Sequence, residues 1–238
     1  METTPLIKTT TSTTRTKSNY NRLACCYNSW SSWEQPYLDA AFDLLNIQPT
    51  DSILDIGCAT GTLLARAGNI THGKVTGIDL SSAMCKISRK HCEELECSVN
   101  IVCGDAFELL QTSSDAIDVQ FDCIAMTFTL ELFDDKDALL LLKSAALRLR
   151  PDSGRMVIVS MSSAVKKGCS MWCYGCFRCC CSCVVDCRPI DLNNLVDQVD
   201  ELEIKSRCVL PMYGLAVEIV EVQRRYYACN KIDNWTRE

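Results

Sequence analysis

The sequence predicts an α/β fold in which a Rossmann-like, doubly wound and mostly parallel sheet ends in an antiparallel hairpin. Two observations support this prediction. Five short apolar runs alternate with helical segments over residues 52–161, and strands that alternate with helices are typical of βαβ units and a parallel sheet. Two further apolar runs, at 201–210 and 215–224, have no helix between them, so we expect them to pair as an antiparallel hairpin.

The individual elements follow from the apolar periodicity and from the residues that interrupt it. Residues 19–46 have helical spacing in two pieces, with Pro36 at a first helical position. Ser81 is expected to cap a helix, because its hydroxyl can accept a free N–H of the first turn. Strands are expected at 52–58, 74–79, 98–103, 120–127 and 155–161, and helices of the sheet region at 62–67, 81–95, 136–150 and 189–199.

The length and charge of the chain limit its organisation and its partners. A chain of 238 residues is long enough for one folded domain, which we place at 19–230 after a disordered tail at 1–18. The net charge of −6 disfavours nucleic acid as a partner, because phosphate contacts need a basic surface. No apolar stretch approaches the length of a membrane-spanning helix. The oligomeric state does not follow from the sequence.

The composition of the N-terminal segment bears on localisation. Residues 3–33 are rich in Thr and Ser and carry basic but no acidic residues. This composition fits either an organellar transit peptide or a disordered tail. We therefore expect a cytoplasmic protein, with a mitochondrial or membrane-associated location as the alternative.

A glycine-containing turn, Asp55-Ile-Gly-Cys-Ala-Thr-Gly61, follows the first predicted strand. Open α/β sheets bind ligands at the carboxyl ends of their strands. A dinucleotide fingerprint fails here because Ala59 and Thr62 stand at its second and third glycine positions, and a phosphate loop fails because no lysine follows Gly61. The remaining feature is an acid two residues before Gly57, which suits a cofactor with a cationic amino-acid end.

Two further acids stand at the ends of the next two predicted strands. Asp79 ends the second strand and can accept hydrogen bonds from both ribose hydroxyls of a nucleoside cofactor. Asp105 follows the third strand and can accept a hydrogen bond from an adenine amino group. Either acid alone is more often a helix cap, but acids in order at the ends of three successive strands predict a nucleoside-containing cofactor.

The segment from Asp55 to Gly61, together with Asp79 and Asp105, resembles motifs one to three of class I S-adenosyl-L-methionine-dependent methyltransferases. The resemblance implies a seven-stranded methyltransferase fold, S-adenosyl-L-methionine as the cofactor, and a methyltransferase domain over 19–230. It also implies cofactor-binding roles, which fall on Asp55, Gly57, Ala59, Gly61, Asp79 and Asp105. Ala59 replaces the usual middle glycine of motif one, a departure that is tolerated if the backbone there needs no positive φ.

A narrower resemblance links the chain to the ubiquinone/menaquinone-biosynthesis (UbiE-like) methyltransferases. It rests on four segments and covers roughly residues 20–224. The segments are Tyr20–Tyr27, Met126–Phe133, Asp186–Ile190 and Tyr213–Glu218. Asn21 replaces the usual Asp of the first segment, and a cysteine cluster at 168–183 replaces a shorter lid segment.

The resemblance implies a small-molecule or lipid-like methyl acceptor, with a ring carbon of a quinone precursor as the first candidate. Two alternatives stay open. One is an N- or O-methyltransferase of another small molecule or phospholipid. The other is a non-catalytic cofactor-binding or membrane-adaptor protein, because fold-level resemblance does not determine the reaction.

Candidate catalytic residues lie after the fifth predicted strand. Asp186 can take a proton from the acceptor, and Arg188 can stabilise a developing phenolate or bind an acidic acceptor group. Alternatively, the two residues form an ion pair that fixes a lid. Glu131 is expected to be structural. Tyr20 is expected to cover the cofactor, since an aromatic face attracts a sulfonium-like cation, whereas Trp30 and Trp33 are expected to pack the N-terminal helices.

Eight of the eighteen cysteines fall between Cys169 and Cys187. The insert 168–187 has three interpretations. Cys169, Cys173, Cys176 and Cys179 have spacings that can surround zinc but lack paired CxxC knuckles, and we assign no metal. Consecutive cysteines among aromatic residues also resemble S-acylated cysteine strings, which would attach the protein peripherally to a membrane. The third interpretation is a lid with cysteine at apolar positions.

Overall fold

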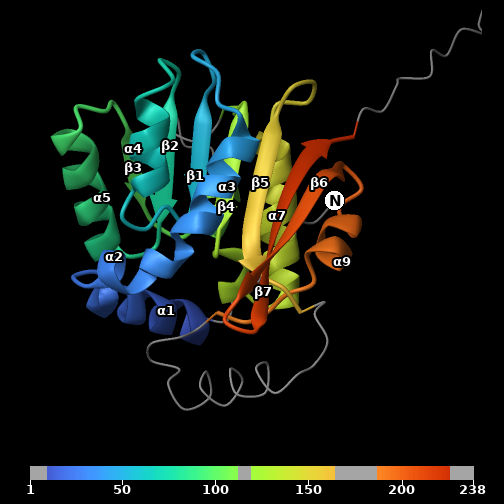
Figure 1. Ribbon diagram of the computed structural model, residues 1–238, viewed down its shortest axis with the longest axis horizontal. Helices are drawn as coiled ribbons and strands as arrows, with labels where there is room; N and C mark the ends of the chain where they lie inside the picture. The colour runs from blue at the N-terminus through green and yellow to red at the C-terminus, as the bar shows by residue number, and fades with distance from the viewer. Residues whose placement is uncertain (1–9, 112–118, 164–186, 226–238) are drawn as a thin grey trace, which may run out of the picture.

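The computed structural model describes residues 10–111, 119–163 and 187–225, which form a seven-stranded sheet with the order β3-β2-β1-β4-β5-β7-β6 (Figure 1). Strands β1 to β5 are parallel, and β7 is antiparallel to both β5 and β6. The strands are β1 (Ile53–Ile56), β2 (Val75–Asp79), β3 (Asn100–Cys103), β4 (Cys123–Thr127), β5 (Arg155–Met161), β6 (Leu202–Met212) and β7 (Leu215–Arg224). The predicted fold class, including the closing hairpin, is confirmed.

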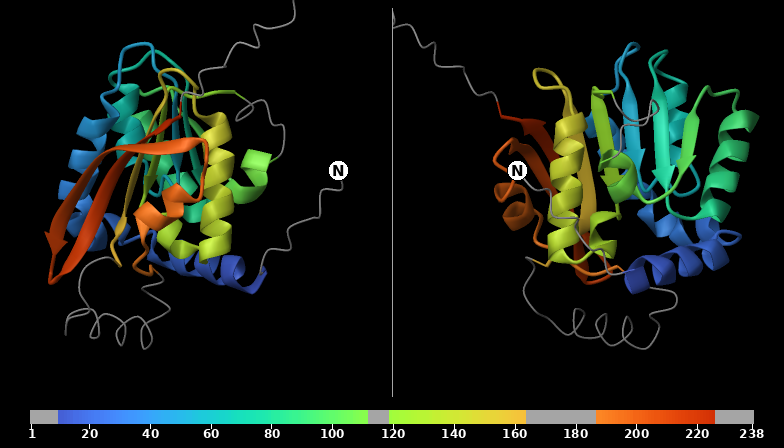
Figure 2. Two further views of the ribbon diagram at one scale, coloured as in Figure 1. Left: turned by 90° about the vertical axis from the view of Figure 1, so that its right-hand side faces the viewer. Right: turned by 180° about the vertical axis from the view of Figure 1, so that it is seen from behind.

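Helices cover both faces of the sheet. Figures 1 and 2 show α3, α4 and α5 on one face and α6, α7 and α9 on the other. Their bounds are α3 (Gln35–Leu45), α4 (Thr62–Gly68), α5 (Ser82–Glu94), α6 (Ala106–Gln111), α7 (Asp135–Arg148) and α9 (Leu192–Asp197). The hydroxyl of Ser81 accepts a hydrogen bond from the backbone N–H of Met84 at 3.2 Å, which confirms the predicted cap of α5.

The core lies in two layers because both faces of the sheet are covered. Leu54 and Ile56 of β1 pack with α7 and α9 residues in one buried cluster, whereas Ile53 packs with α3 and α4 residues in the other. All four residues of β1 are buried, as expected for a central parallel strand. This double burial explains why the sequence shows continuous apolar runs in place of a strict alternation.

The N-terminal region crosses the carboxyl ends of the strands, as both views of Figure 2 show. It consists of α1 (Thr10–Leu23), α2 (Tyr27–Trp30) and the short 3-10 helix η1 (Ser31–Glu34). Helix α1 begins at Thr10, so residues 10–18 are helical and not a disordered tail. Its Thr-rich sequence has low helix propensity, and tertiary contacts offset that cost, because Thr16 and Asn19 are buried against the domain.

Asn21 fastens α1 to the start of α5. Its side-chain oxygen accepts hydrogen bonds from the hydroxyl of Ser81 at 2.7 Å and from the backbone N–H of Ala83 at 3.1 Å. The neutral amide of Asn21 thus joins α1 to the N-terminal end of α5.

The cysteine insert predicted at 168–187 lies outside the described residues, apart from Cys187. Its zinc, acylation and lid interpretations therefore remain predictions. None of the helices in the described part of the chain has the length and hydropathy needed to cross a membrane.

Candidate functional site

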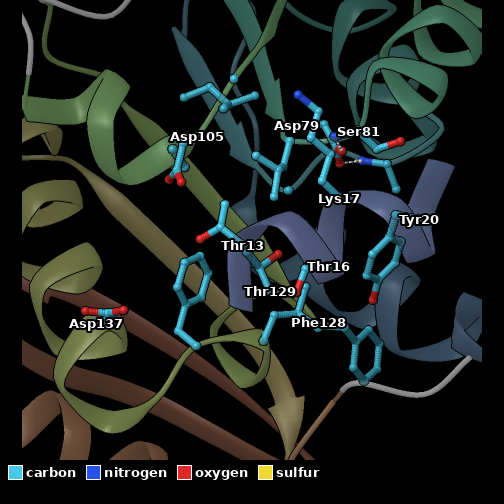
Figure 3. A pocket seen from close by; sticks show the side chains of 18 of the residues that line it. Thr13, Thr16, Lys17, Tyr20, Asp79, Ser81, Asp105, Phe128, Thr129 and Asp137 are labelled. Atoms are coloured by element: carbon cyan, nitrogen blue, oxygen red, sulfur yellow. Dashed lines mark hydrogen bonds between the residues drawn. The ribbon is translucent and has the colours of Figure 1, made fainter. Parts of the chain in front are cut away.

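A cavity opens at the carboxyl ends of the parallel strands, beneath α1 (Figure 3). Its wall comes from segments far apart in the chain, because the parallel topology brings the ends of β1 to β4 to one edge of the sheet. Four predicted site residues besides Tyr20 line it: Gly57, Ala59, Asp79 and Asp105. Gly61 lines neither this cavity nor the adjoining one described below.

The turn after β1 depends on left-handed backbone conformations. Gly57 has φ 82° and Gly61 has φ 79°. A Cβ atom on Gly57 would lie 2.3 Å from Oγ1 of Thr129, and one on Gly61 would lie 2.3 Å from Oγ of Ser88. The two glycines therefore allow the turn to pack closely against the segment after β4 and against α5.

Ala59 also has a positive φ, of 44°. The expectation that the missing glycine is harmless depended on a backbone without positive φ, and that condition is not met. An L-residue in the left-handed region carries a steric cost between Cβ and the following carbonyl. The turn from Asp55 to Gly61 therefore includes a strained backbone at Ala59, the position where the motif usually has glycine.

Asp79 connects the ends of β1 and β2. Its Oδ2 accepts a hydrogen bond from the backbone N–H of Ala59 at 2.9 Å, and its Oδ1 accepts one from the N–H of Ser81 at 2.8 Å. Burial raises the pKa of Asp79, and these two hydrogen bonds act in the opposite direction. Each carboxylate oxygen can accept a further hydrogen bond from a ligand.

Asp105 follows β3 and both caps α6 and lines the cavity. Its Oδ1 accepts a hydrogen bond from the backbone N–H of Phe107 at 3.0 Å. The N–H of Gly104 donates to the carbonyl of Asp79 at 2.9 Å, which joins the ends of β2 and β3. Figure 3 shows Asp79 and Asp105 around the cavity together with Thr13, Thr16 and Lys17 of α1.

Asp55 lies in a second cavity that adjoins the first. The two cavities share Gly57 and Ala59, so they meet at the turn after β1. Asp55 is only 1% exposed, and its Oδ1 has no hydrogen-bond partner among the described residues. Burial and the neighbouring Asp79 raise the pKa of Asp55 to about 7. A buried carboxylate oxygen without a donor is costly, and a cationic ligand would offset that cost.

Tyr20 lines the first cavity, as a covering residue should. Its ring lies 6.3 Å from that of Tyr27, and its hydroxyl lies 4.0 Å from the sulfur of Cys187. Trp33 packs edge-on against Phe128 with ring centroids 5.5 Å apart, which confirms the packing role expected for it. The side chain of Trp30 lies outside the described residues.

Of the two predicted catalytic residues, only Arg188 belongs to the described part of the chain. Asp186 lies outside the described residues. Nε of Arg188 donates to the carbonyl of Phe133 at 2.6 Å, and its guanidinium forms an ion pair with Asp135 at 2.7 Å. Arg188 lines neither cavity, although Phe133 lines the first one. A catalytic role for Asp186 and Arg188 stays a prediction.

Glu131 has the structural position expected for it. It is 1% exposed, and its Oε2 accepts a hydrogen bond from the backbone N–H of Met161 at 2.8 Å. Burial raises the pKa of Glu131 to about 7, and the Met161 N–H opposes that shift. Glu131 therefore holds the end of β5 against the segment after β4.

Several residues of the two cavities carried no recognisable signal in the sequence. Thr16 and Lys17 of α1 line the first cavity, together with Phe128 after β4. Glu34 lines the second. The Thr-rich composition of the N-terminal segment favoured disorder, and a lone acid in η1 matches no motif. Only the folded chain brings these residues to the strand ends.

The donor set of the cavities suits an organic ligand. Within the described ranges, no group of His, Cys, Asp and Glu is arranged to hold a metal ion. The first cavity offers carboxylates at the ends of β2 and β3, and the second offers the buried Asp55 without any basic residue in its described lining. The acids of the first cavity suit hydroxyl and amino donors, with Lys17 as the basic residue of its described lining, and the second cavity suits a cationic group.

Comparisons with known proteins agree with this geometry. Residues 53–152 match the family described as "Methyltransferase domain". A ubiquinone biosynthesis O-methyltransferase of Coxiella burnetii is 30% identical over 102 residues, which make up 42% of this chain and 39% of that protein. The ubiquinone/menaquinone biosynthesis C-methyltransferase UbiE of Escherichia coli is 27% identical over 128 residues, or 52% of this chain and 47% of that protein. The chain thus spans less than half the length of these relatives.

A solved structure supports the fold independently of sequence. Magnesium protoporphyrin IX methyltransferase from Synechocystis PCC 6803, crystallised with bound S-adenosylmethionine, aligns with a TM-score of 0.67. The alignment covers 94% of this chain and 100% of that chain, at 12% sequence identity. At this identity the likeness establishes the architecture and leaves the reaction to be argued from the site.

Proposed function

We propose that this chain, which carries a class I methyltransferase domain with S-adenosylmethionine as its cofactor, transfers the methyl group to a small or lipid-like acceptor. The observation that carries the proposal is the set of three acids at the ends of three successive strands. Asp55, Asp79 and Asp105 stand in the two adjoining cavities, around a turn that Gly57 brings close to both. A ring carbon of a quinone precursor is the first candidate for the methylated atom.

Each acid matches one part of the cofactor. Asp79 would accept hydrogen bonds from the ribose hydroxyls, and Asp105 would accept one from the adenine amino group. Asp55 would face the cationic amino-acid end, which its unpartnered buried oxygen suits. Gly57 lets the backbone approach the ligand closely, since it has no side chain to interpose.

The bound cofactor supplies an electrophilic methyl group on a sulfonium centre. The task of the protein is then to align the acceptor with that group and to exclude water. Phe128, Leu132 and Phe133 give the first cavity an apolar wall, and α1 covers it with Thr16 and Tyr20. Such a wall favours an acceptor with an apolar body.

The acceptor class is supported by the relatives as well as by the cavity. Both curated relatives are named for ubiquinone biosynthesis, one as an O-methyltransferase and one as a C-methyltransferase. The apolar part of the cavity also fits another small molecule or a phospholipid headgroup, which remain the alternative acceptors. A non-catalytic cofactor-binding or adaptor protein is the alternative without methyl transfer.

Localisation belongs to the same proposal. We place the protein in the cytoplasm, with peripheral attachment to a membrane through the cysteine insert, where a lipid-like acceptor is concentrated. A mitochondrial location is the alternative, based on the acid-free, Thr-rich segment 3–33.

The test is a methyl-transfer assay with radiolabelled cofactor across quinone precursors, phospholipids and small amines. Transfer to a quinone precursor with no transfer to the other two classes is the expected result. Methyl transfer to amines or phospholipids alone would show that one of these classes, and not a quinone precursor, is the acceptor. Tight binding of the cofactor without transfer to any class would favour the non-catalytic alternative.

A further inference from the structure

The second cavity contains a buried acid that no motif identifies. Glu34 ends η1 and is only 7% exposed, and it lines this cavity together with Asp55. The described lining of the cavity includes no Lys, Arg or His. Two buried carboxylates therefore share one cavity without a positive charge from the described lining, an arrangement that is costly unless a ligand supplies one.

The groups around Glu34 increase this cost. The hydroxyl of Tyr27 donates a hydrogen bond to Oε2 of Glu34 at 3.3 Å. Burial and the nearby Glu131 raise the pKa of Glu34 to about 8, and only the Tyr27 bond acts in the other direction. Burial raises the pKa of the Cys187 thiol and of the Tyr20 hydroxyl well above their usual values, and the nearby Glu34 carboxylate adds to both shifts. Among the described residues, the titratable groups named here around Glu34 are acids or weak acids.

The two cavities adjoin at the turn after β1. Besides Gly57 and Ala59, both are lined by Tyr27 and Thr127. A ligand whose nucleoside end lies against Asp79 in the first cavity would enter the second cavity past this turn, and Asp55 and Glu34 both line that cavity.

We propose that Glu34 and Asp55 together form a two-carboxylate subsite for the ammonium group of the amino-acid end of the cofactor. This inference rests on the proposed function. An ammonium group has three N–H donors and no acceptor. The unpartnered Oδ1 of Asp55 supplies one acceptor, and the carboxylate of Glu34, fixed by Tyr27, supplies another.

Binding at such a subsite is linked to proton release. With the pKa of Asp55 at about 7 and that of Glu34 at about 8, both groups are partly protonated in the free protein at neutral pH. A bound ammonium group favours their ionised forms and lowers both pKa values. Cofactor affinity should therefore rise as the pH increases from 6 to about 8, and protons should leave the protein on binding.

The test compares two ligands that differ in the amino-acid end. S-adenosylhomocysteine carries the ammonium group, and methylthioadenosine keeps the nucleoside and the sulfur without it. In calorimetry with the full chain, Glu34→Gln should lower the affinity for S-adenosylhomocysteine roughly ten- to hundredfold, because the variant loses a hydrogen bond to a charged group. The affinity for methylthioadenosine should change less than twofold.

The matched control is Asp39→Asn, which removes the same charge from the neighbouring helix. Asp39 is exposed, pairs with Arg66 and lines neither cavity, so both affinities should persist. If Glu34→Gln lowers the affinity for both ligands equally, or lowers neither affinity, the proposed subsite is wrong. A wild-type protein that binds neither ligand would instead overturn the proposed function and the subsite together.

A second measurement uses the wild-type protein, so its result does not depend on whether the Glu34→Gln variant folds. Calorimetry of the wild type in buffers of different ionisation enthalpy counts the protons released at pH 7. We expect S-adenosylhomocysteine to release more protons than methylthioadenosine. Equal release for the two ligands would contradict a subsite at which Glu34 and Asp55 ionise.

Discussion

The backbone N–H of Ala59 donates a hydrogen bond to Oδ2 of Asp79 at a distance of 2.9 Å. This bond joins the turn after β1 to the end of β2, and the other oxygen of the same carboxylate is bound by the N–H of Ser81. The residue proposed to hold the ribose thus also fixes the loop that approaches the rest of the cofactor. The shape of the turn and the proposed ribose contact thus involve the same side chain.

Asp79→Ala should therefore weaken the binding of S-adenosylmethionine and S-adenosylhomocysteine by about 1–3 kcal/mol, the cost of leaving buried hydrogen-bonding groups unpaired. Calorimetry measures the loss, and NAD serves as a ligand that neither protein should bind. Binding of NAD by the wild type, or unchanged affinity in the variant, would contradict the assignment of the site.

Ala59→Gly should stabilise the protein by about 1 kcal/mol, because glycine adopts the φ of 44° without the steric cost that alanine carries. Urea unfolding measures the change, and the Ala59 N–H bond to Asp79 is retained. As a control, Ala40→Gly within α3 should lower stability by a similar amount, since the backbone there is helical. Destabilisation by Ala59→Gly would show that residue 59 is not strained.

The stability of the ligand-free protein should fall as the pH rises from about 4 to 8. The pKa values of Asp55 and Glu131 are raised to about 7 and that of Glu34 to about 8, whereas unfolded carboxyls titrate near 4. The folded state then binds more protons than the unfolded state in this window, so deprotonation favours unfolding.

Urea unfolding at pH 5, 6.5 and 8 tests this dependence. Glu34→Gln should flatten the decline, because the amide cannot ionise, and the exposed Glu108→Gln should leave it unchanged. Stability that increases steadily from pH 5 to pH 8 would contradict the raised pKa values.

Arg188→Ala should lower methyl transfer and leave cofactor affinity nearly unchanged. Arg188 binds the carbonyl of Phe133, a residue of the first cavity, but lines neither cavity itself. The variant Asp135→Asn removes only the exposed ion-pair partner and should have little effect, since such pairs contribute little. If cofactor affinity falls as far as the rate, Arg188 acts only as a structural residue.

The cysteine insert should govern membrane association and not cofactor binding. Two acyl chains, each adding about 0.8 kcal/mol per buried methylene, would hold the protein at a bilayer. Replacing Cys179, Cys180, Cys181 and Cys183 by Ser should move the protein into the soluble fraction of cells without changing its affinity for S-adenosylmethionine. A wild-type protein that is fully soluble would exclude acylation, and stoichiometric zinc would support the metal site.

The sheet could be predicted from the sequence because its central strands are buried on both faces. The predicted strand at 155–161 coincides with β5, and the others differ from the structure by a few residues at their ends. Acids at the strand ends were also visible, since topology places Asp79 and Asp105 at one edge of the sheet. Local pattern and global fold agree in this part of the chain.

Other features depend on contacts that the sequence does not display. Helix α1 forms from a Thr-rich segment that lacks helical periodicity, and α6 is too short to show any. Glu34 reaches the cavity that Asp55 also lines only after the N-terminal region folds across the strand ends. The position of Arg188 follows from the path of the chain after β5, which the motif could not specify.

The bond between Asn21 and the start of α5 has a consequence for how the covering helix responds to salt. An amide carries no net charge, so its hydrogen bonds to Ser81 and Ala83 are not weakened by counterions as an ion pair would be. A carboxylate at the same position would attract the positive end of α5 and lose part of that attraction at high ionic strength. We therefore expect the contribution of Asn21 to the docking of α1 over the cavity to be insensitive to ionic strength.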